Sequence, residues 1–427
     1  MEELDAGLGK LNLNSESFEG GGPENGILDQ IPFRPSSSLT TKLSYTPRYL
    51  FRVFSKASAG ENTSVWIKSP DATKGRLADI FARNDAPNVA ITLNEHLRWS
   101  DPKSQGDPFI SWTTSLAFAI HYAIYKRKTE RTELQTIYLC IVDTTKFPQG
   151  VFLRDLDLVE EFEDKVPEGR SIIIKGRENT WKYRGLGDFG TLRRKKHSDC
   201  AGFYYFGEYL SQGQMKINGR SCIVSCDKMV NHHLFTLVLD FRIELSANPP
   251  RWAQPVVELR EPFYCSSSLN AKIAETAHLT AAITIALEFM DNWVLPVFAN
   301  LLALSPRRPQ DGRIIGVIIY GFSSDRKRLL LSQETKVVAD DTIPEVQQFG
   351  ELMRDIKEGA QTPQQSQQIF KWLEGMDQND LSPLIQALSR LTDCHTATTT
   401  KTTPAHPVTP TRPPITPIRE RRRPLKP

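Results

Sequence analysis

Short apolar and aromatic runs recur along the first half of the chain, separated by polar or glycine-containing segments. The run YLFRVF follows Pro47, and the run SCIVSC alternates around an Ile-Val centre. Runs of roughly four to eight β-branched and aromatic residues bounded by turn-forming residues are typical of strands. This pattern predicts strands at 49–54, 109–112, 137–142, 201–210, 221–226 and 234–241.

Helical spacing appears directly after the second of these strands. Leu116, Ile120 and Ile124 fall on one face of a helix. The hydroxyl of Thr114 or Ser115 can accept a hydrogen bond from the first free amide groups, so we expect the helix to begin there.

Three other segments of the first half are more polar. A short helix is expected around 78–83. The acidic segment 155–164 predicts an amphipathic helix whose carboxylates face water. Residues 165–200 are basic and contain glycine, which favours a long loop or two short strands.

The pattern changes after Pro249 and Pro250. Residues 266–290 have the spacing of a long helix, and IIGVIIYGF at 314–322 predicts a strand. Residues 343–392 predict two or more amphipathic helices. The expected organisation is α+β: a flexible leader at 1–45, an α+β domain at 46–245, a mixed or mostly helical region at 250–392, and a disordered tail at 394–427.

Composition excludes some classes of protein. The formal net charge is +3, from 53 basic and 50 acidic residues, which by itself implies neither a nucleic-acid nor a membrane partner. The apolar stretch 281–304 carries Glu288 and Asp291, which favours a buried helix over a membrane span. The start MEELDAGLGK has no apolar core of a secretion signal. We therefore expect a soluble, intracellular protein of the cytoplasm or nucleus.

Two motifs predict neither a metal nor a dinucleotide fold. Cys222 and Cys226 on one strand would lie about 13 Å apart, too far to share a metal, so buried thiols are expected and no metal site. GLGDFG at 185–190 matches the GxGxxG spacing, but WKYR before it and TLRRKK after it are neither a buried strand nor an apolar helix. The basic run at 193–197 fits a localisation signal, a phosphate-binding patch or a solvated loop.

The tail has a composition that cannot bury a core. From Thr396 onward it holds seven basic residues against Glu420, with Thr-Pro steps and PxxP spacing. Such a segment can dock on a proline-reading protein partner, be phosphorylated or serve nuclear import. Nucleic-acid binding through 165–200 and the tail is a further alternative.

Four polar residues lie on or beside predicted strands. Arg52 is within YLFRVF, Ser111 and Thr113 end the strand before the capped helix, and Glu208 follows an aromatic run. Inward-facing polar side chains on strands either belong to exposed edge strands or converge in a cleft between two sheets.

The order of these residues resembles the Arg-Ser-Glu branch of the ADP-ribosyltransferases, which contains the cholera-toxin-like and pierisin-like enzymes. Within that branch the chain is similar to an uncharacterised fungal domain family that opens with LFRV and carries a PFIS segment. The resemblance covers about residues 47–235. It implies an ADP-ribosyltransferase-like split β-sandwich with flanking helices, and NAD as the cofactor.

The resemblance also implies a role for each residue. Arg52 would bind the pyrophosphate or the nicotinamide ribose of NAD. Ser111, with Thr113 on the same strand, would orient Glu208, and Glu208 would bind the ribose 2′-hydroxyl and stabilise the cation formed as nicotinamide leaves. The nicotinamide ring would stack on an aromatic side chain, for which the candidates are Trp112, Tyr204 and Tyr205.

One position departs from the pattern of arginine-modifying members. Two residues before Glu208, where those members carry Glu or Gln, this chain has Phe206. A phenyl ring cannot hydrogen-bond an acceptor, so the expected activities are transfer to another acceptor or NAD hydrolysis. The alternative is a catalytically inactive interaction or scaffold protein on the same fold.

Overall fold

The computed structural model describes residues 29–35, 39–99, 106–165, 185–198, 201–265, 273–289, 291–321, 343–359 and 382–390. The tail from 394, with its expected partner sites, lies outside these residues. So do residues 1–28 of the expected leader and residues 166–184 of the expected basic loop.

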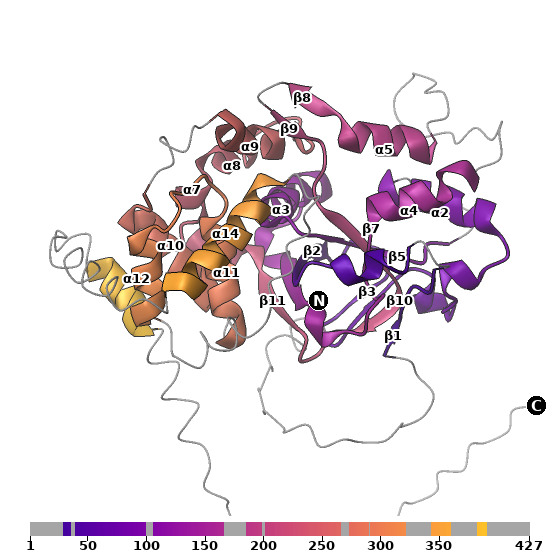
Figure 1. Cartoon of the computed structure of the whole chain (residues 1–427), viewed down its shortest axis with the longest axis horizontal. Helices are drawn as coiled ribbons and strands as arrows, with labels where there is room; N and C mark the ends of the chain where they lie inside the picture. Colours follow the sequence, from indigo (N-terminus) through magenta and orange to yellow (C-terminus); the bar gives the residue numbers. More distant parts are fainter. Residues whose placement is uncertain are drawn as a thin grey trace, which may run out of the picture.

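Within the described residues, nine strands form one antiparallel sheet that curls into a half-barrel (Figure 1). Its main path runs β11-β6-β2-β5-β10-β4-β3, and β1 and β7 also pair with β10. The sequence predictions of β2, β5, β6 and β11 are confirmed. The strands are β1 (Gln30–Ile31), β2 (Tyr49–Ser55), β3 (Glu61–Asn62), β4 (Trp66–Lys68), β5 (Phe109–Thr113), β6 (Ile137–Asp143), β7 (Leu153–Arg154), β10 (Glu208–Lys216) and β11 (Ser221–Ser225).

The sheet is almost divided between β2 and β5. Strand β2 pairs with β6 along its whole length, from Tyr49 opposite Asp143 to Ser55 opposite Ile137. Against β5, by contrast, only Phe51 has a partner, Thr113. The two strands diverge on either side of this pair, so main-chain groups that face the gap need other hydrogen-bond partners.

A single hydrophobic core joins the α+β region to the helices that follow it. Helix α3 (Leu116–Glu130) packs on β2 and β6, and its other side packs on later helices, which gather on one side of the sheet in Figure 1. Ser115 caps α3 by accepting the amide of Phe118, as predicted. The later helices are α6 (Cys226–Asn231), α7 (Leu234–Leu237), α8 (Leu239–Glu244), α9 (Gln254–Cys265), α10 (Thr276–Leu287), α11 (Val294–Leu302), α12 (Gly312–Gly321) and α14 (Pro344–Gly359).

A second helical layer covers the sheet near β5 and β10. It consists of α2 (Ala86–Leu97), α4 (Asp155–Phe162) and α5 (Leu186–Arg194), which share a core with Phe109 and Leu210. A helix was predicted at 78–83, where the structure has only a single helical turn, Ile80–Ala82. Helix α2, which follows this turn, was not predicted. Loop or strands had been expected where α5 lies, so that expectation was wrong for 186–194.

Two predicted strands are helices. LFTLVLDF forms α7 and α8, and IIGVIIYGF forms α12 over its described part. A short apolar run has no period that separates a buried strand from a buried helix. Both segments place side chains such as Phe241 and Ile318 in a core that they share with other helices, where a strand would leave its main-chain groups without partners.

Three further expectations need correction. The run 201–210 is not one strand, because Gly207 has φ +65° and separates β9 (Ala201–Phe203), which pairs with β8 (Lys196–Ser198), from β10. Strand β1 belongs to the sheet although it falls in the expected leader. Asp155 and Asp157 of α4 are buried rather than solvated.

No helix in the described part of the chain is both long and apolar enough to cross a membrane. Among the same residues, no three His, Cys, Asp or Glu side chains are grouped so that they could hold a metal ion.

Candidate active site

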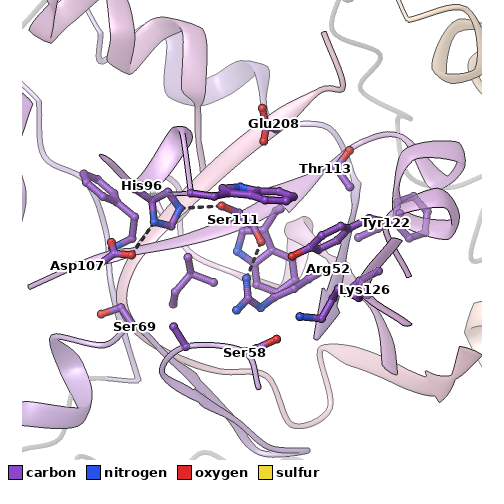
Figure 2. A pocket seen from close by; sticks show the side chains of 18 of the residues that line it. Arg52, Ser58, Ser69, His96, Asp107, Ser111, Thr113, Tyr122, Lys126 and Glu208 are labelled. Atoms are coloured by element: carbon purple, nitrogen blue, oxygen red, sulfur yellow. Dashed lines mark hydrogen bonds and ion pairs between the residues drawn. The ribbon is translucent and has the colours of Figure 1, made fainter. Parts of the chain in front are cut away.

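A cavity of about 500 Å³ opens where β2 and β5 diverge. Arg52, Ser111 and Glu208, which come from three neighbouring strands, all line it. The geometric expectation that these three residues share one cleft is therefore met. Figure 2 shows Ser111 and Arg52 at its centre, His96 and Asp107 on one side, and Tyr122 on the other.

Arg52 bridges the gap between the two halves of the sheet. Its Nη1 donates to the main-chain oxygen of Ser111 at 2.9 Å, and its Nε and Nη2 donate to Oδ1 of Asn62 on β3 at 3.2 and 3.0 Å. The Ser111 carbonyl is one of the groups that β2 leaves unpaired. Burial lowers the pKa of the Arg52 guanidinium, which still stays charged at neutral pH.

Ser111 ends a chain of hydrogen bonds that begins at Asp107. Oδ2 of Asp107 lies 2.7 Å from Nδ1 of His96, and Nε2 of His96 lies 2.7 Å from Oγ of Ser111 (Figure 2). Asp107 is fixed in turn because its Oδ1 accepts the amide of Phe109 at 2.9 Å. All three side chains line the cavity.

Glu208, the first residue of β10, is buried and forms an ion pair with Arg193 of α5. The carboxylate thus reaches toward the second helical layer. Arg193 also donates to the main-chain oxygen of Tyr204 and lies over the ring of Phe206, 5.3 Å from its centroid.

Ser111 and Glu208 lie on the same face of the β5–β10 pair. Ser111 is opposite Leu210 and Glu208 is opposite Thr113, so the two are diagonal neighbours, roughly 7–8 Å apart in such a pair. The expected hydrogen bond between them is not formed, because the Ser111 hydroxyl is bonded to His96 and the Glu208 carboxylate to Arg193.

The other predicted residues have mainly structural contacts. The Thr113 hydroxyl donates to the main-chain oxygen of Phe206. Trp112 is among the residues that line the cavity, but its ring is buried against Phe152 and its indole N–H donates to Ser211. Tyr204 is not among the residues that line the cavity, and its hydroxyl bonds Gln254.

Tyr122 is an aromatic residue of the cavity that was not among the predicted rings. It lines the cavity from α3, and burial raises the pKa of its phenol to about 12. Trp99, another lining residue, packs on it with the ring centroids 5.0 Å apart. Lys126, one turn further along α3, is ion-paired with Glu130. The cavity therefore combines aromatic walls with three cationic side chains, Arg52, Lys68 and Lys126.

Asp155 is a buried carboxyl group close to the Glu208–Arg193 pair. Its Oδ1 accepts the amide of Leu156 at 2.8 Å, whereas Oδ2 has no hydrogen-bond partner within the described residues. Burial first, and then the charge of Glu208, raise the pKa of Asp155 well above its usual value. The charged form is thus destabilised in the folded protein.

Replacing Asp155 with asparagine should raise the free energy of unfolding by about 1–3 kcal/mol at neutral pH. A carboxyl whose pKa is raised on folding lowers stability as the pH rises above its unfolded value of ~3.9. The difference in the free energy of unfolding between Asp155→Asn and the wild type should therefore shrink toward pH 4. Chemical denaturation of both proteins from pH 4 to 8 would measure it. Asp157→Asn is the control: Asp157 is also buried but paired with Arg154 at 2.9 Å, so stability should fall. A loss of stability in Asp155→Asn at neutral pH contradicts the prediction.

His96, Asp107, Tyr122 and Arg193 belong to the site but were not among the residues predicted from the sequence. Of these, His96 could have been placed on a helix, because Val89, Leu93 and Leu97 are spaced four residues apart and are buried. Nothing in the local pattern distinguishes Asp107, Tyr122 or Arg193, which reach the cavity or Glu208 only through the fold.

Comparison with known proteins gives one match. Residues 45–187 are similar to a family described as a domain of unknown function, DUF7587. No curated protein and no solved structure matches the chain. The matched segment contains Arg52, His96, Asp107 and Ser111 and ends before Glu208.

Proposed function

We propose that the cavity binds NAD and that the protein cleaves the bond between nicotinamide and ribose, either by transfer of ADP-ribose or by hydrolysis. One observation carries the proposal: Arg52, Ser111 and Glu208, which were chosen from the sequence by resemblance to ADP-ribosyltransferases, line a single cavity. The three residues come from the neighbouring strands β2, β5 and β10, and their meeting in one cavity is what the resemblance requires.

Each residue has chemistry that suits the proposed role. The guanidinium of Arg52 has five N–H groups, and its hydrogen bonds to Ser111 and Asn62 use three of them, which leaves donors for a phosphate or ribose oxygen. A cavity of about 500 Å³ is within the range of small-molecule sites, although NAD would extend beyond it. Tyr122 offers an aromatic face for a nicotinamide ring.

The acceptor is not arginine under this proposal. Phe206 is buried and stacks on Phe118 with ring centroids 4.6 Å apart, so neither its chemistry nor its position can hold a guanidinium acceptor in the cavity. Water or another nucleophile would take the ADP-ribose.

A second candidate is a binding protein on the same fold. The observation in its favour is the ion pair that holds Glu208 to Arg193, because a carboxylate held in this way is not free to bind ribose. An enzyme would have to exchange Arg193 for the substrate, whereas a binding protein would keep the ion pair.

NAD titration of the full chain tests the proposal, with nicotinamide release as the second readout. Arg52→Ala should weaken NAD binding by roughly 10- to 100-fold, because hydrogen bonds to charged groups contribute about 1.5–3 kcal/mol. Glu208→Gln should bind NAD but release nicotinamide about 100- to 1000-fold more slowly.

Glu258→Gln is the matched control. Glu258 is also paired with an arginine, Arg251 at 2.9 Å, but it does not line the cavity, so both readouts should be unchanged. Binding without release would favour the binding protein. Absence of NAD binding by the wild type would overturn the proposal.

A further inference from the structure

The hydrogen-bond chain of Asp107, His96 and Ser111 has the order and spacing of a nucleophile activated by a base. An activated serine needs an imidazole within about 2.6–3.2 Å of its oxygen and a third group that orients the imidazole. Both hydrogen bonds of His96 measure 2.7 Å, and they use its two different ring nitrogens. His96 lies in the last turn of α2, Asp107 precedes β5 and Ser111 is within β5.

The partners of His96 fix its tautomer. An ionised carboxylate can only accept, so Nδ1 of a neutral His96 carries the proton that is shared with Asp107. The lone pair of Nε2 then faces the hydroxyl of Ser111, which donates to it. This is the arrangement in which a histidine can remove the serine proton.

Arg52 supplies positive charge at the same place. Its Nη1 is 2.9 Å from the main-chain oxygen of Ser111, so the guanidinium is held beside the residue that would attack. Its unused N–H groups are available to an oxyanion that forms on the substrate.

We propose that Ser111 is a nucleophile, with His96 as its general base and Asp107 as the positioning residue, and that the cavity hydrolyses small carboxylic esters. This activity goes beyond NAD cleavage and needs no NAD. The cavity volume of about 500 Å³ is large enough for both the acyl and the alcohol group of a small ester.

The reaction balances with water as the only co-substrate. Oγ of Ser111 bonds to the ester carbon while its proton moves to Nε2 of His96. The ester C–O bond breaks, and the alkoxide that leaves takes this proton. A water molecule then attacks the acyl-serine and gives its proton to His96, which returns it to Oγ as the carboxylic acid departs.

The test is reaction of the full chain with diisopropyl fluorophosphate, followed by peptide mapping by mass spectrometry. The expected result is one phosphoryl group on Ser111, formed as the P–F bond breaks. Ser58 lines the same cavity, but its Oγ accepts the amide of Ser55, so it should stay unmodified. Hydrolysis of p-nitrophenyl acetate should stop once Ser111 is labelled.

Variants of His96 and Asp107 show whether these residues activate Ser111 or only stabilise the fold. His96→Gln should slow labelling by roughly 100-fold or more, and Asp107→Asn should slow it as well, while thermal unfolding shows whether each variant is folded. Absence of labelling at Ser111 in the folded wild type overturns the proposal, and so does an unchanged labelling rate in folded His96→Gln. Either outcome would mean that the hydrogen bonds among Asp107, His96 and Ser111 only connect α2 to β5. Neither bears on NAD, because the reaction contains none.

Discussion

Replacing Arg260 with methionine should lower the free energy of unfolding by about 3–5 kcal/mol, because it leaves a buried carboxylate without its partner. Arg260 of α9 is 1% exposed and Glu345 of α14 is 4% exposed, and their side chains are 2.7 Å apart. Arg260 also donates to the main-chain oxygen of Tyr205 at 2.6 Å. The guanidinium therefore joins the helical region to the segment that leads into Glu208, and chemical denaturation would measure its loss.

Two comparisons test whether the unpaired carboxylate of Glu345 causes the loss of stability. Lys68→Met removes a partly exposed ion pair with Glu61 at 2.8 Å and should cost at most about 1 kcal/mol. The double variant Arg260→Met with Glu345→Leu should lose less than the sum of the single variants, because it leaves no unpaired charge. A loss near 1 kcal/mol in Arg260→Met would show that the pair is not essential for joining the two regions.

The strands around the cavity were predictable because their signal is local. β2, β5, β6 and β11 combine β-branched or aromatic residues with turn-forming neighbours. A sheet whose two faces are both covered by other parts of the chain keeps these runs apolar. The predicted site residues Arg52, Ser111 and Glu208 were visible because a polar residue in or beside such a run is unusual.

Helices α10 and α14 lie in segments predicted as helical, but other parts of the helical region could not be predicted in the same way. α12 and the pair α7–α8 are short and apolar on several sides, so no period identifies them as helices. Their identity depends on the core that they share with α3. One core extends across the expected boundary near 245–250, because it includes Phe51 of the sheet and Phe298 of α11.

The contacts inside the site are the least predictable part. Arg193 appeared in the sequence only as part of a basic run, yet it is the partner of Glu208. His96 and Asp107 meet Ser111 because α2 shares a core with Phe109 of β5, and the residues of α2 in that core are apolar ones elsewhere on the helix. A sequence shows which residues can do chemistry, whereas the fold decides which of them meet.

Replacing Gly207 with alanine should lower the free energy of unfolding by about 2–5 kcal/mol. Gly207 has φ +65°, which costs an alanine about 1–2 kcal/mol. A Cβ there would also lie 1.9 Å from Oγ1 of Thr114 and 2.7 Å from Cδ1 of Ile343, and relieving such overlap in a packed region costs about 1–3 kcal/mol. The backbone must move at the residue before Glu208, so the candidate site should be disturbed as well.

A matched glycine separates the two contributions. Gly219 has φ +71° but nothing within 4 Å of its added Cβ, so Gly219→Ala should show the backbone cost alone. Thr114→Ala should then recover part of the loss in the Gly207→Ala background, because Oγ1 of Thr114 has no hydrogen-bond partner in the described part of the chain and its removal makes room. Equal losses at Gly207 and Gly219 would mean that close packing beside Glu208 contributes nothing. A larger loss at Gly207 that Thr114→Ala partly reverses would show that the close packing of Gly207 against Thr114 stabilises the segment that leads into Glu208.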